Sequence, residues 1–372
     1  MTAHSKTKTI VVKLGTSILT AGTKSLSKEH ILEIVRVLAR LHSEGHRIVV
    51  VTSGAQAAGR DALGLTSLGK NIANRQMLAA VGQTYLIDLW AELFAIYRIN
   101  IGQILLTRAD LQDRERYLNA RDTINALLDN KIIPVVNEND ALVVAEIKVG
   151  DNDNLSARVA VLADADVLFL LTDQNGLYTA DPNKDPEAKL ISEVEEITDE
   201  VKNIAGDSIS GLGTGGMFTK IQAAQIATMS GIEVNIVSGR HPEYINEFDS
   251  PQHHGTRFKA KSNPIERRKS WILSGQAPRG MVNIDDGAVD ALVNKGSSLL
   301  PIGIKIVDGK FARGDVIKVC DMNSREIARG ITHYDSDDLQ RIKGVKSEDV
   351  ANILGFEHGS VVIHRDDLVV VA

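Results

Sequence analysis

The sequence predicts an α/β protein with a mainly parallel open sheet covered by helices on both faces, followed by a small β-rich domain. Short β-branched runs alternate with longer helical patterns through most of the chain, as in βαβ units. Aromatic residues are only 4% of the total, so aliphatic residues must build the core, which suits a sheet buried on both faces. After about residue 255, short strands separated by Gly, Asp and Asn take over.

The first elements are a strand, a glycine turn and an amphipathic helix. Ile10–Leu14 reads as the strand, and the helix spans Ser27 to Glu44, with a serine suited to its start and Gly45 to its end. Arg47–Val51 is a second strand, and a long helix covers about Asn71 to Tyr97. Further short apolar strands are expected at Ile101–Leu106, Ile132–Val136, Val167–Leu171 and Val234–Val237. The order of the strands in the sheet cannot be read from this pattern.

The C-terminal part has a different composition. Residues 259–269 (KAKSNPIERRK) are polar and contain Pro264, which favours a linker at 259–270 over a surface loop within one domain. We therefore expect domains at 1–258 and 271–372. The second domain is predicted to be a mixed barrel whose short strands are Trp271–Leu273, Gly303–Val307, Val316–Val319 and Val361–Ile363, with short helices near Gly287–Asn294 and Asp335–Arg341.

Length and charge narrow the class of protein. A chain of 372 residues exceeds one comfortable core, so two domains are expected. The formal net charge of −6 argues against broad nucleic-acid binding. Cys320 is the one cysteine, which excludes an intrachain disulfide and favours a reducing compartment. No apolar run suits a signal peptide or a membrane span, so we expect a cytoplasmic protein without membrane contact.

Small and polar residues follow the predicted strands, where ligands bind in open parallel sheets. Lys13 lies in or just after an apolar strand, where an ammonium group needs an anionic partner, although a lysine at a strand edge is often simply solvated. Gly15 allows close approach of a ligand, and the hydroxyls of Thr16 and Ser17 add donors. Together these residues favour an anion site. Two further strands run directly into Thr52–Ala55 and Thr172–Tyr178.

Other strand ends leave alternatives open. Thr52–Ala55 opens a short helix whose N–H groups could bind an anion, but a plain N-cap explains the same residues. Asn137–Asp140 and Asp151–Asp153 could hold an ammonium group or arrange cationic groups, whereas such clusters more often indicate metal sites or turns. Their spacing does not fit an EF-hand calcium loop.

The strongest local signal is the glycine-rich stretch Gly211–Lys220 (GLGTGGMFTK), which leaves backbone N–H groups free for phosphates and precedes a helix closing at Gly231. The chain has no P-loop motif. Gly211, Gly213 and Gly216 fit G-x-G-x-x-G, but AGDSIS rather than an apolar strand precedes them, and Glu233 begins its strand instead of ending one. A dinucleotide-binding dehydrogenase is therefore excluded.

Taken in order, these segments closely resemble the amino acid kinase family, and within it the member that phosphorylates the 5-carboxylate of L-glutamate. The resemblance rests on VVKLGTSILT, VVTSGAQAAGR, LLTRADLQDRERYLNARDT, VNENDA, IKVGDNDNLSA, LLTDQNGLYTADP and SGLGTGGMFTK. In the C-terminal part, GSSLLPIGIKIVDGKFARGDVIKV and GITHYDSDDLQRI resemble a PUA domain. The resemblance covers essentially the whole chain. It implies a layered αβα sandwich with a fused PUA barrel, ATP as phosphoryl donor, Mg²⁺ as cofactor, and the first step of L-proline biosynthesis.

Site residues follow from the resemblance position by position. It implies that Lys13 and Lys220 are catalytic lysines organised by Asp153. Glutamate would be bound by Ser53, Asn137, Asp140 and Asn152, and ATP by Lys13, Gly15, Thr172, Asp173, Thr214, Gly215, Gly216, Met217, Phe218, Thr219 and Lys220. No metal ligand is assigned to the protein, because Mg²⁺ would bind mainly through the ATP phosphates. Gln56 and Phe218 depart from the family pattern, and Phe218 lies inside the nucleotide loop.

The resemblance also implies partners that the residues alone do not. These are proline as an inhibitor, a homo-oligomer (dimer or tetramer), and transfer of a labile acyl phosphate to glutamate-5-semialdehyde dehydrogenase. The rivals are a kinase of the same fold for another small acid, such as acetylglutamate, aspartate, carbamate or a nucleoside monophosphate, and an RNA-binding protein acting through the PUA domain. Residues 277–372 hold 12 Lys/Arg against 15 Asp/Glu, so RNA contact has weak support.

Overall fold

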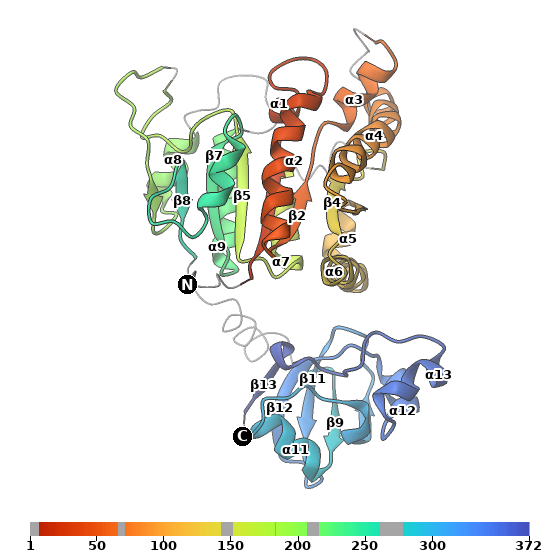
Figure 1. Cartoon of the computed structure of the whole chain (residues 1–372). Helices are drawn as coiled ribbons and strands as arrows, with labels where there is room; N and C mark the ends of the chain where they lie inside the picture. The colour runs from red at the N-terminus through yellow and green to blue at the C-terminus, as the bar shows by residue number, and fades with distance from the viewer. Residues whose placement is uncertain are drawn as a thin grey trace. The chain divides into compact units, whose positions relative to one another are not determined.

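The computed structural model describes residues 7–65, 71–142, 152–182, 184–206, 216–260 and 278–371. The chain divides into two compact units, Met1–Ser262 and Asn263–Ala372, and each is described by itself below (Figure 1). The predicted linker at 259–270 lies outside the described residues beyond Ala260, and the predicted strand Trp271–Leu273 lies wholly outside them.

The first unit is built on one sheet, which has eight strands within the described ranges, in the order β3-β4-β2-β1-β5-β7-β8-β6. Every neighbouring pair is parallel except β7 and β8, which run antiparallel. The strands are β1 (Thr9–Leu14), β2 (Arg47–Val51), β3 (Ile101–Leu106), β4 (Ile133–Glu138), β5 (Val167–Thr172), β6 (Glu193–Val194), β7 (Glu233–Ser238) and β8 (Thr256–Phe258). The prediction of a mainly parallel α/β sheet is confirmed.

Helices cover both faces of this sheet, because alternate residues of its central strands point to opposite sides. On β1, Val11 belongs to one buried apolar cluster and Ile10 and Val12 to another. The cluster of Val11 packs against helices on its side of the sheet, namely α6 (Arg114–Asp129), α7 (Asn152–Leu162), α8 (Asp199–Gly206) and α9 (Met217–Met229). The opposite cluster packs against α1 (Thr16–Leu19), α2 (Lys28–Ser43), α3 (Ala55–Ala62), α4 (Ile72–Ala95) and the short 3₁₀ helix η2 (Pro242–Glu247). The result is a three-layer sandwich.

Local chemistry sets the helix ends. Ser27 caps α2, its side chain accepting a hydrogen bond from the backbone N–H of His30, and Gly45 beyond the other end has a φ of 96°. Asn71 caps α4 by accepting from the backbone N–H of Asn74. These are the boundaries that the sequence predicts for both helices, to within two residues.

Two glycines let α3 and α4 pack with their backbones in contact. A Cβ atom on Gly82 of α4 would lie 1.8 Å from the carbonyl oxygen of Ala55, and one on Gly59 of α3 would lie 2.0 Å from that of Leu78. No side chain can be accommodated at either position. This packing fixes the start of α3, which is the segment that follows β2 at the ligand-binding edge of the sheet.

The second unit contains a separate mixed sheet of five strands within the described residues, in the order β10-β9-β11-β12-β13. Its strands are β9 (Gly280–Ile284), β10 (Ile304–Gly309), β11 (Val316–Cys320), β12 (Glu326–Ile331) and β13 (Leu368–Val370), and its helices are α11 (Asp286–Val293), α12 (Ser336–Ile342) and α13 (Val350–Leu354), with 3₁₀ turns at Pro301–Gly303, Ser347–Asp349 and Arg365–Asp367. Ile284, Ile317 and Tyr334 lie in its buried core. A β-rich module with short helices is therefore confirmed.

The predicted strand Val361–Ile363 is wrong in detail. Ile363 forms an isolated bridge with Leu299 and is not part of a strand. Conversely, β9, β12 and β13 were not predicted: β9 and β12 are interrupted by Gly, Asn or charged residues, and β13 has only three residues. Across the parts of the chain that the structure describes, no helix combines the length and apolar character needed to cross a bilayer.

Candidate active site

Two lysines from different elements converge on one buried carboxylate. The Nζ atom of Lys13 lies 2.5 Å from Oδ1 of Asp153, and the Nζ atom of Lys220 lies 3.2 Å from Oδ2 of the same residue. The side chain of Lys13 is 3% exposed, that of Lys220 is 6% exposed, and that of Asp153 is 0% exposed. Burying like charges is costly unless an opposite charge lies between them, and Asp153 supplies that charge. The triad itself carries one net positive charge and is thus suited to an anion.

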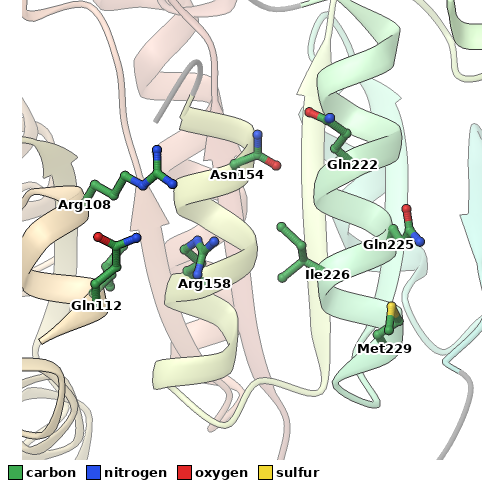
Figure 2. A pocket seen from close by; sticks show the side chains of 9 residues that line it. Arg108, Gln112, Asn154, Arg158, Gln222, Gln225, Ile226 and Met229 are labelled. Carbon is green, nitrogen blue, oxygen red and sulfur yellow. The ribbon is translucent and has the colours of Figure 1, made fainter. Parts of the chain in front are cut away.

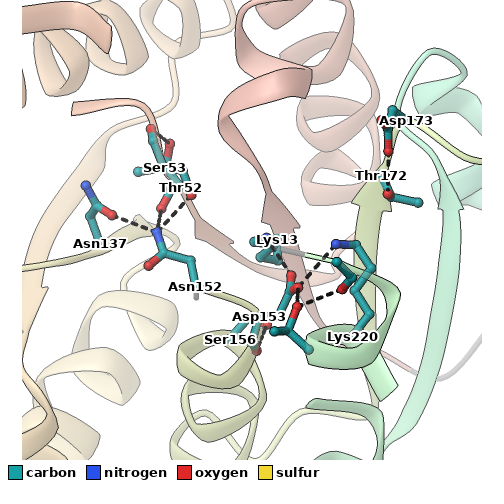
Figure 3. Close-up of polar contacts among 12 residues, drawn as sticks. Lys13, Thr52, Ser53, Asn137, Asn152, Asp153, Ser156, Thr172, Asp173 and Lys220 are labelled. Carbon is teal, nitrogen blue, oxygen red and sulfur yellow. Dashed lines mark hydrogen bonds and ion pairs between the residues drawn. The ribbon is translucent and has the colours of Figure 1, made fainter. Parts of the chain in front are cut away.

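The fold explains why these residues meet (Figure 3). Lys13 follows the period of Val11 on β1 and so faces the layer of α7 and α9. Asp153 is in the first turn of α7, and Lys220 is in the first turn of α9. Because α7 and α9 both begin at the carboxyl edge of the parallel strands, their first turns lie close to Lys13.

A hydroxyl group also contacts this carboxylate from the α9 side. The Oγ1 hydroxyl of Thr219 lies 2.8 Å from Oδ2 of Asp153 and also 2.8 Å from the carbonyl oxygen of Gly216. Gly216 is the N-cap of α9, and a Cβ atom there would meet nothing within 4 Å. Met217 is half-buried, whereas Phe218 is 39% exposed and lies in the first turn of α9 and not in the loop before it. Thr214 and Gly215 lie outside the described residues.

A network of amides and hydroxyls lies on the β2 and β4 side of the lysines (Figure 3). The Nδ2 group of Asn152 donates to the carbonyl oxygen of Thr52 at 2.6 Å, to Oγ of Ser53 at 2.9 Å and to Oδ1 of Asn137 at 3.0 Å. Asn137 in turn donates to Oε1 of Gln83 on α4 at 2.8 Å. Ser53, Asn137 and Asn152, predicted as one set, are therefore in contact.

Packing and a buried hydrogen bond fix the turn after β2. Gly54, the N-cap of α3, has a φ of 93°, a conformation that favours glycine, and a Cβ atom there would lie 3.3 Å from Leu26. The fully buried indole of Trp90 donates its Nε1 hydrogen to Oγ1 of Thr52 at 3.1 Å. Thr52 and Trp90 thus support the same backbone whose carbonyl group accepts from Asn152.

Asp140 lies beyond the end of β4 and lines a cavity of about 320 Å³ together with Gln83, Gln103 and Glu138. Gln83 therefore links this cavity to the Asn137–Asn152 network. Gln56, which departs from the family pattern, is half-buried on α3.

Thr172 and Asp173 lie at the end of β5, on the opposite side of the lysines from Asn152 (Figure 3). The hydroxyl of Thr172 donates to Oδ1 of Asp173 at 3.1 Å, and the backbone N–H of Gly239 donates to the carbonyl oxygen of Thr172 at 2.7 Å. Gly15 follows β1, and a Cβ atom on it would lie 3.7 Å from Nζ of Lys13. A ligand phosphate at this edge can therefore come close to the lysine.

Three contributors were missed by the sequence reasoning: Gln83, Thr52 and Trp90. Gln83 and Trp90 lie inside a long helical pattern, where polar or aromatic residues give no signal of what they contact. Thr52 was read only as part of a helix start. Their roles depend on packing between α4 and the sheet, which the sequence does not encode locally.

The donor set does not provide a protein-built metal cage. Within the residues the structure describes, no three His, Cys, Asp or Glu side chains gather closely enough to hold a metal ion. Carboxylate and carbonyl oxygens are the preferred ligands of Mg²⁺, which commonly binds through only one or two carboxylates plus substrate phosphates.

Comparisons with known proteins agree with this architecture. Residues 8–238 match the model of the amino acid kinase family, and residues 280–354 match that of the PUA domain. Glutamate 5-kinases of Salmonella newport and Salmonella typhimurium are each 57% identical over 365 residues, covering 98% of this chain and 99% of theirs. The solved structure of carbamate kinase from Giardia lamblia bound to AMP-PNP covers 68% of this chain and 99% of its own, with 16% identity and a TM-score of 0.50, a likeness of fold alone.

Proposed function

The chain belongs to the amino acid kinase family, and from this premise we propose that it transfers the terminal phosphoryl group of ATP to the side-chain carboxylate of L-glutamate. The 57% identity to glutamate 5-kinases along nearly the whole chain supports this substrate. The product would be glutamyl 5-phosphate, an acyl phosphate, formed in the first step of L-proline biosynthesis. The enzyme is thus a kinase with a carboxylate as acceptor.

One structural observation supports the mechanism: the buried lysines stand between the Asn152 network on one side and Thr172 and Asp173 on the other. The order of strands is β4-β2-β1-β5, so Asn137 and Ser53 fall on one side of Lys13 and Thr172 on the other. We assign the Asn152 network and Asp140 to glutamate. Thr172, Asp173 and the loop from Thr214 to Lys220 are assigned to ATP. A phosphoryl group transferred from ATP to glutamate would therefore pass next to the ammonium groups of Lys13 and Lys220.

The chemistry needs charge neutralisation rather than a base. A glutamate side chain has an unperturbed pKa of about 4.3, so its carboxylate is already an ionised nucleophile at neutral pH. Lys13 and Lys220 stabilise the charge that spreads over the transferring phosphoryl oxygens, and Asp153 holds both ammonium groups in position. The backbone N–H groups at the start of α9 add donors for phosphate oxygens.

Mg²⁺, the expected cofactor, would neutralise charge on the nucleotide phosphates when bound. Asp173, which follows β5 and contacts Thr172, would help to order such a complex.

The deciding experiment is acyl phosphate formation. The purified full chain is incubated with ATP, Mg²⁺ and L-glutamate, and acyl phosphate is trapped as a hydroxamate. Comparable ADP release with acetylglutamate, aspartate, carbamate or a nucleoside monophosphate in place of glutamate would contradict the assigned substrate. Including proline tests the proposed inhibition, and adding glutamate-5-semialdehyde dehydrogenase tests transfer of the acyl phosphate.

Two further proposals concern assembly and the C-terminal domain. We propose a homo-oligomer, a dimer or tetramer, which mass measurement in solution tests. RNA binding by the PUA domain is the weaker candidate, since residues 277–372 carry an excess of three acidic residues. The absence of any gel shift at low salt would dismiss it. A cytoplasmic location is likewise proposed from the family and from the lone cysteine.

A further inference from the structure

A second polar cavity, of about 410 Å³, lies in a groove between α5 (Arg108–Gln112), α7 and α9 (Figure 2). Its volume is in the range of sites for small molecules. None of its lining residues belongs to the assigned glutamate or ATP set, so it is distinct from the proposed active site. It extends from Asn154 in the first turn of α7 to Met229 at the end of α9, and these two helices carry Asp153 and Lys220.

Two guanidinium groups line this cavity, Arg108 from α5 and Arg158 from α7 (Figure 2). Both side chains are exposed. Neither has an ion pair or side-chain hydrogen bond to another residue of the described chain, unlike most other arginines of this unit. Two like charges held on one cavity wall favour an anion of matching charge.

The acidic residues of the three surrounding helices are already engaged elsewhere. Asp110 of α5 accepts hydrogen bonds from Thr107 and pairs with Arg116 at 3.0 Å. Asp153 of α7 holds the two lysines, and α9 contains no acidic residue at all. Among the described residues, no carboxylate lines the cavity, so none of them cancels the positive charge of its arginines.

Carboxamides complete the polar lining. Gln112, Asn154, Gln222 and Gln225 face the same groove, and each offers N–H donors to an oxyanion. The Oδ1 atom of Asn154 is buried and meets no hydrogen-bond donor in the described structure. A buried acceptor of this kind is normally satisfied, so a ligand that carries a hydroxyl or N–H group suits the site. Ile226 provides part of an apolar floor.

From these contacts we propose that the groove binds a small dianion, either a phosphate ester or a dicarboxylate, through Arg108 and Arg158. The planar guanidinium groups match the geometry of both kinds of oxyanion, and the carboxamides orient the remainder of the molecule. Because Asn154 is next to Asp153 and Gln222 is two residues from Lys220, a bound dianion would bridge the two helices that begin in the active site.

The test is isothermal titration of the full chain with inorganic phosphate and, separately, with succinate. Excess AMP-PNP, Mg²⁺ and glutamate are present throughout to occupy the active site. The wild-type protein should bind at least one of the two probes saturably, with a Kd of about 1 mM or tighter. Arg108→Gln and Arg158→Gln should each weaken that binding by roughly tenfold or more, because each removes a charge-assisted contact.

Arg75→Gln is the matched control, since Arg75 is an exposed arginine on α4 whose side chain makes no ion pair or hydrogen bond within the described residues. Helix α4 packs on the opposite face of the sheet from α7 and α9. This variant should bind as the wild type does. Binding of phosphate alone identifies a phosphate ester as the ligand class, and binding of succinate alone identifies a dicarboxylate. Absence of saturable binding of both probes, or equal affinity in the wild type and both groove variants, overturns the proposal.

Discussion

The ammonium group of Lys13 lies 2.5 Å from the carboxylate of Asp153, and both side chains are almost completely shielded from solvent. Such a pair can be formed only if the strand β1 and the first turn of α7 keep a fixed spacing. The same carboxylate holds Lys220 from α9. Asp153 is therefore the point at which three elements of the fold depend on one another, and its loss should affect stability as well as catalysis.

Asp153→Ala should lower the free energy of unfolding by about 3–5 kcal/mol, because it leaves two buried ammonium groups without their carboxylate. Urea denaturation of the full chain measures the change. Glu92→Ala is the control, since it breaks a solvent-exposed ion pair with Lys28 and should cost at most about 1 kcal/mol. Equal decreases in the free energy of unfolding of the two variants would show that the buried ion pairs of Asp153 stabilise the fold no more than the exposed pair does.

Lys13→Ala and Lys220→Ala should each reduce kcat by roughly 10²–10³-fold, as expected for loss of one preorganised donor to the transition state. Steady-state assays of ADP release measure this, with thermal melting to confirm that each variant is folded. Lys28→Ala, which removes an exposed lysine, should retain full turnover. A folded Lys13 or Lys220 variant with near wild-type kcat would remove that residue from the mechanism.

Asp140→Ala should raise the KM for glutamate by about tenfold, the effect of losing one charge-assisted contact, while the KM for ATP stays nearly unchanged. The reason is its place in the cavity beyond β4, away from Thr172 and Asp173. Initial rates with each substrate varied in turn give both constants. A parallel rise of both would indicate misfolding or a different role for Asp140.

Gly82→Ala should destabilise the first unit by about 1–3 kcal/mol or more, since the added methyl group would overlap the backbone of α3. Gly216→Ala makes the same chemical change where nothing lies within 4 Å, and its free energy of unfolding should remain close to the wild-type value. Chemical denaturation of both variants provides the comparison. Unaltered stability of Gly82→Ala would mean that α3 and α4 are not packed as closely as described.

Asp285 gives a pH-dependent prediction for the second unit. Its carboxylate accepts the backbone N–H of Ala288 at the start of α11 and pairs with Lys305 at 3.0 Å, and these contacts lower its pKa below the ordinary value. A lowered pKa in the folded state means that the contribution to stability is present above the unfolded pKa and is lost as the pH falls through the folded one. Asp285→Ala should therefore cost about 1 kcal/mol at pH 7, typical of a lost N-cap.

The difference between wild type and Asp285→Ala should shrink as the pH is lowered below about 4, where unfolded carboxyl groups become protonated. Urea denaturation at pH 7 and at acid pH measures it. Asp286→Ala, at the exposed neighbouring position, serves as the control. A cost that remains constant down to the acid limit would show that the ionised form of Asp285 contributes nothing beyond the neutral one.

The sequence predicted the bounds of a strand or helix best where residues within that element determine them. The apolar runs of β1, β2 and β5 and the caps of α2 and α4 are local signals, so their bounds could be predicted closely. The meeting of Lys13 with Asp153 followed from resemblance, since nothing in the spacing of 140 residues between them reveals contact. The short strands β9 and β13 could not be found, because they pair with strands far along the chain. Strand β12 pairs with the neighbouring β11, but its charged residues and glycine obscure the strand pattern.

Only part of the candidate site could be predicted, because some of its contacts depend on packing between elements far apart in the sequence. Ser53, Asn137 and Asn152 were grouped correctly in space, but the support of Asn137 by Gln83 and of Thr52 by Trp90 depends on how α4 packs. Thr219 was expected to contact nucleotide, and its hydrogen bond to Asp153 adds a structural contact that the glycine-rich motif does not suggest.

The hydrogen bond from Trp90 to Thr52 gives this chain a built-in optical reporter. The emission of an indole depends on what its N–H group touches, and here the hydroxyl it touches belongs to the residue whose carbonyl group accepts from Asn152. The sequence contains only one other tryptophan, Trp271, so Trp271→Phe leaves a single indole, next to the network that we assign to glutamate. Titrating that variant with glutamate should convert occupancy of the acceptor side directly into a change of fluorescence, without any label.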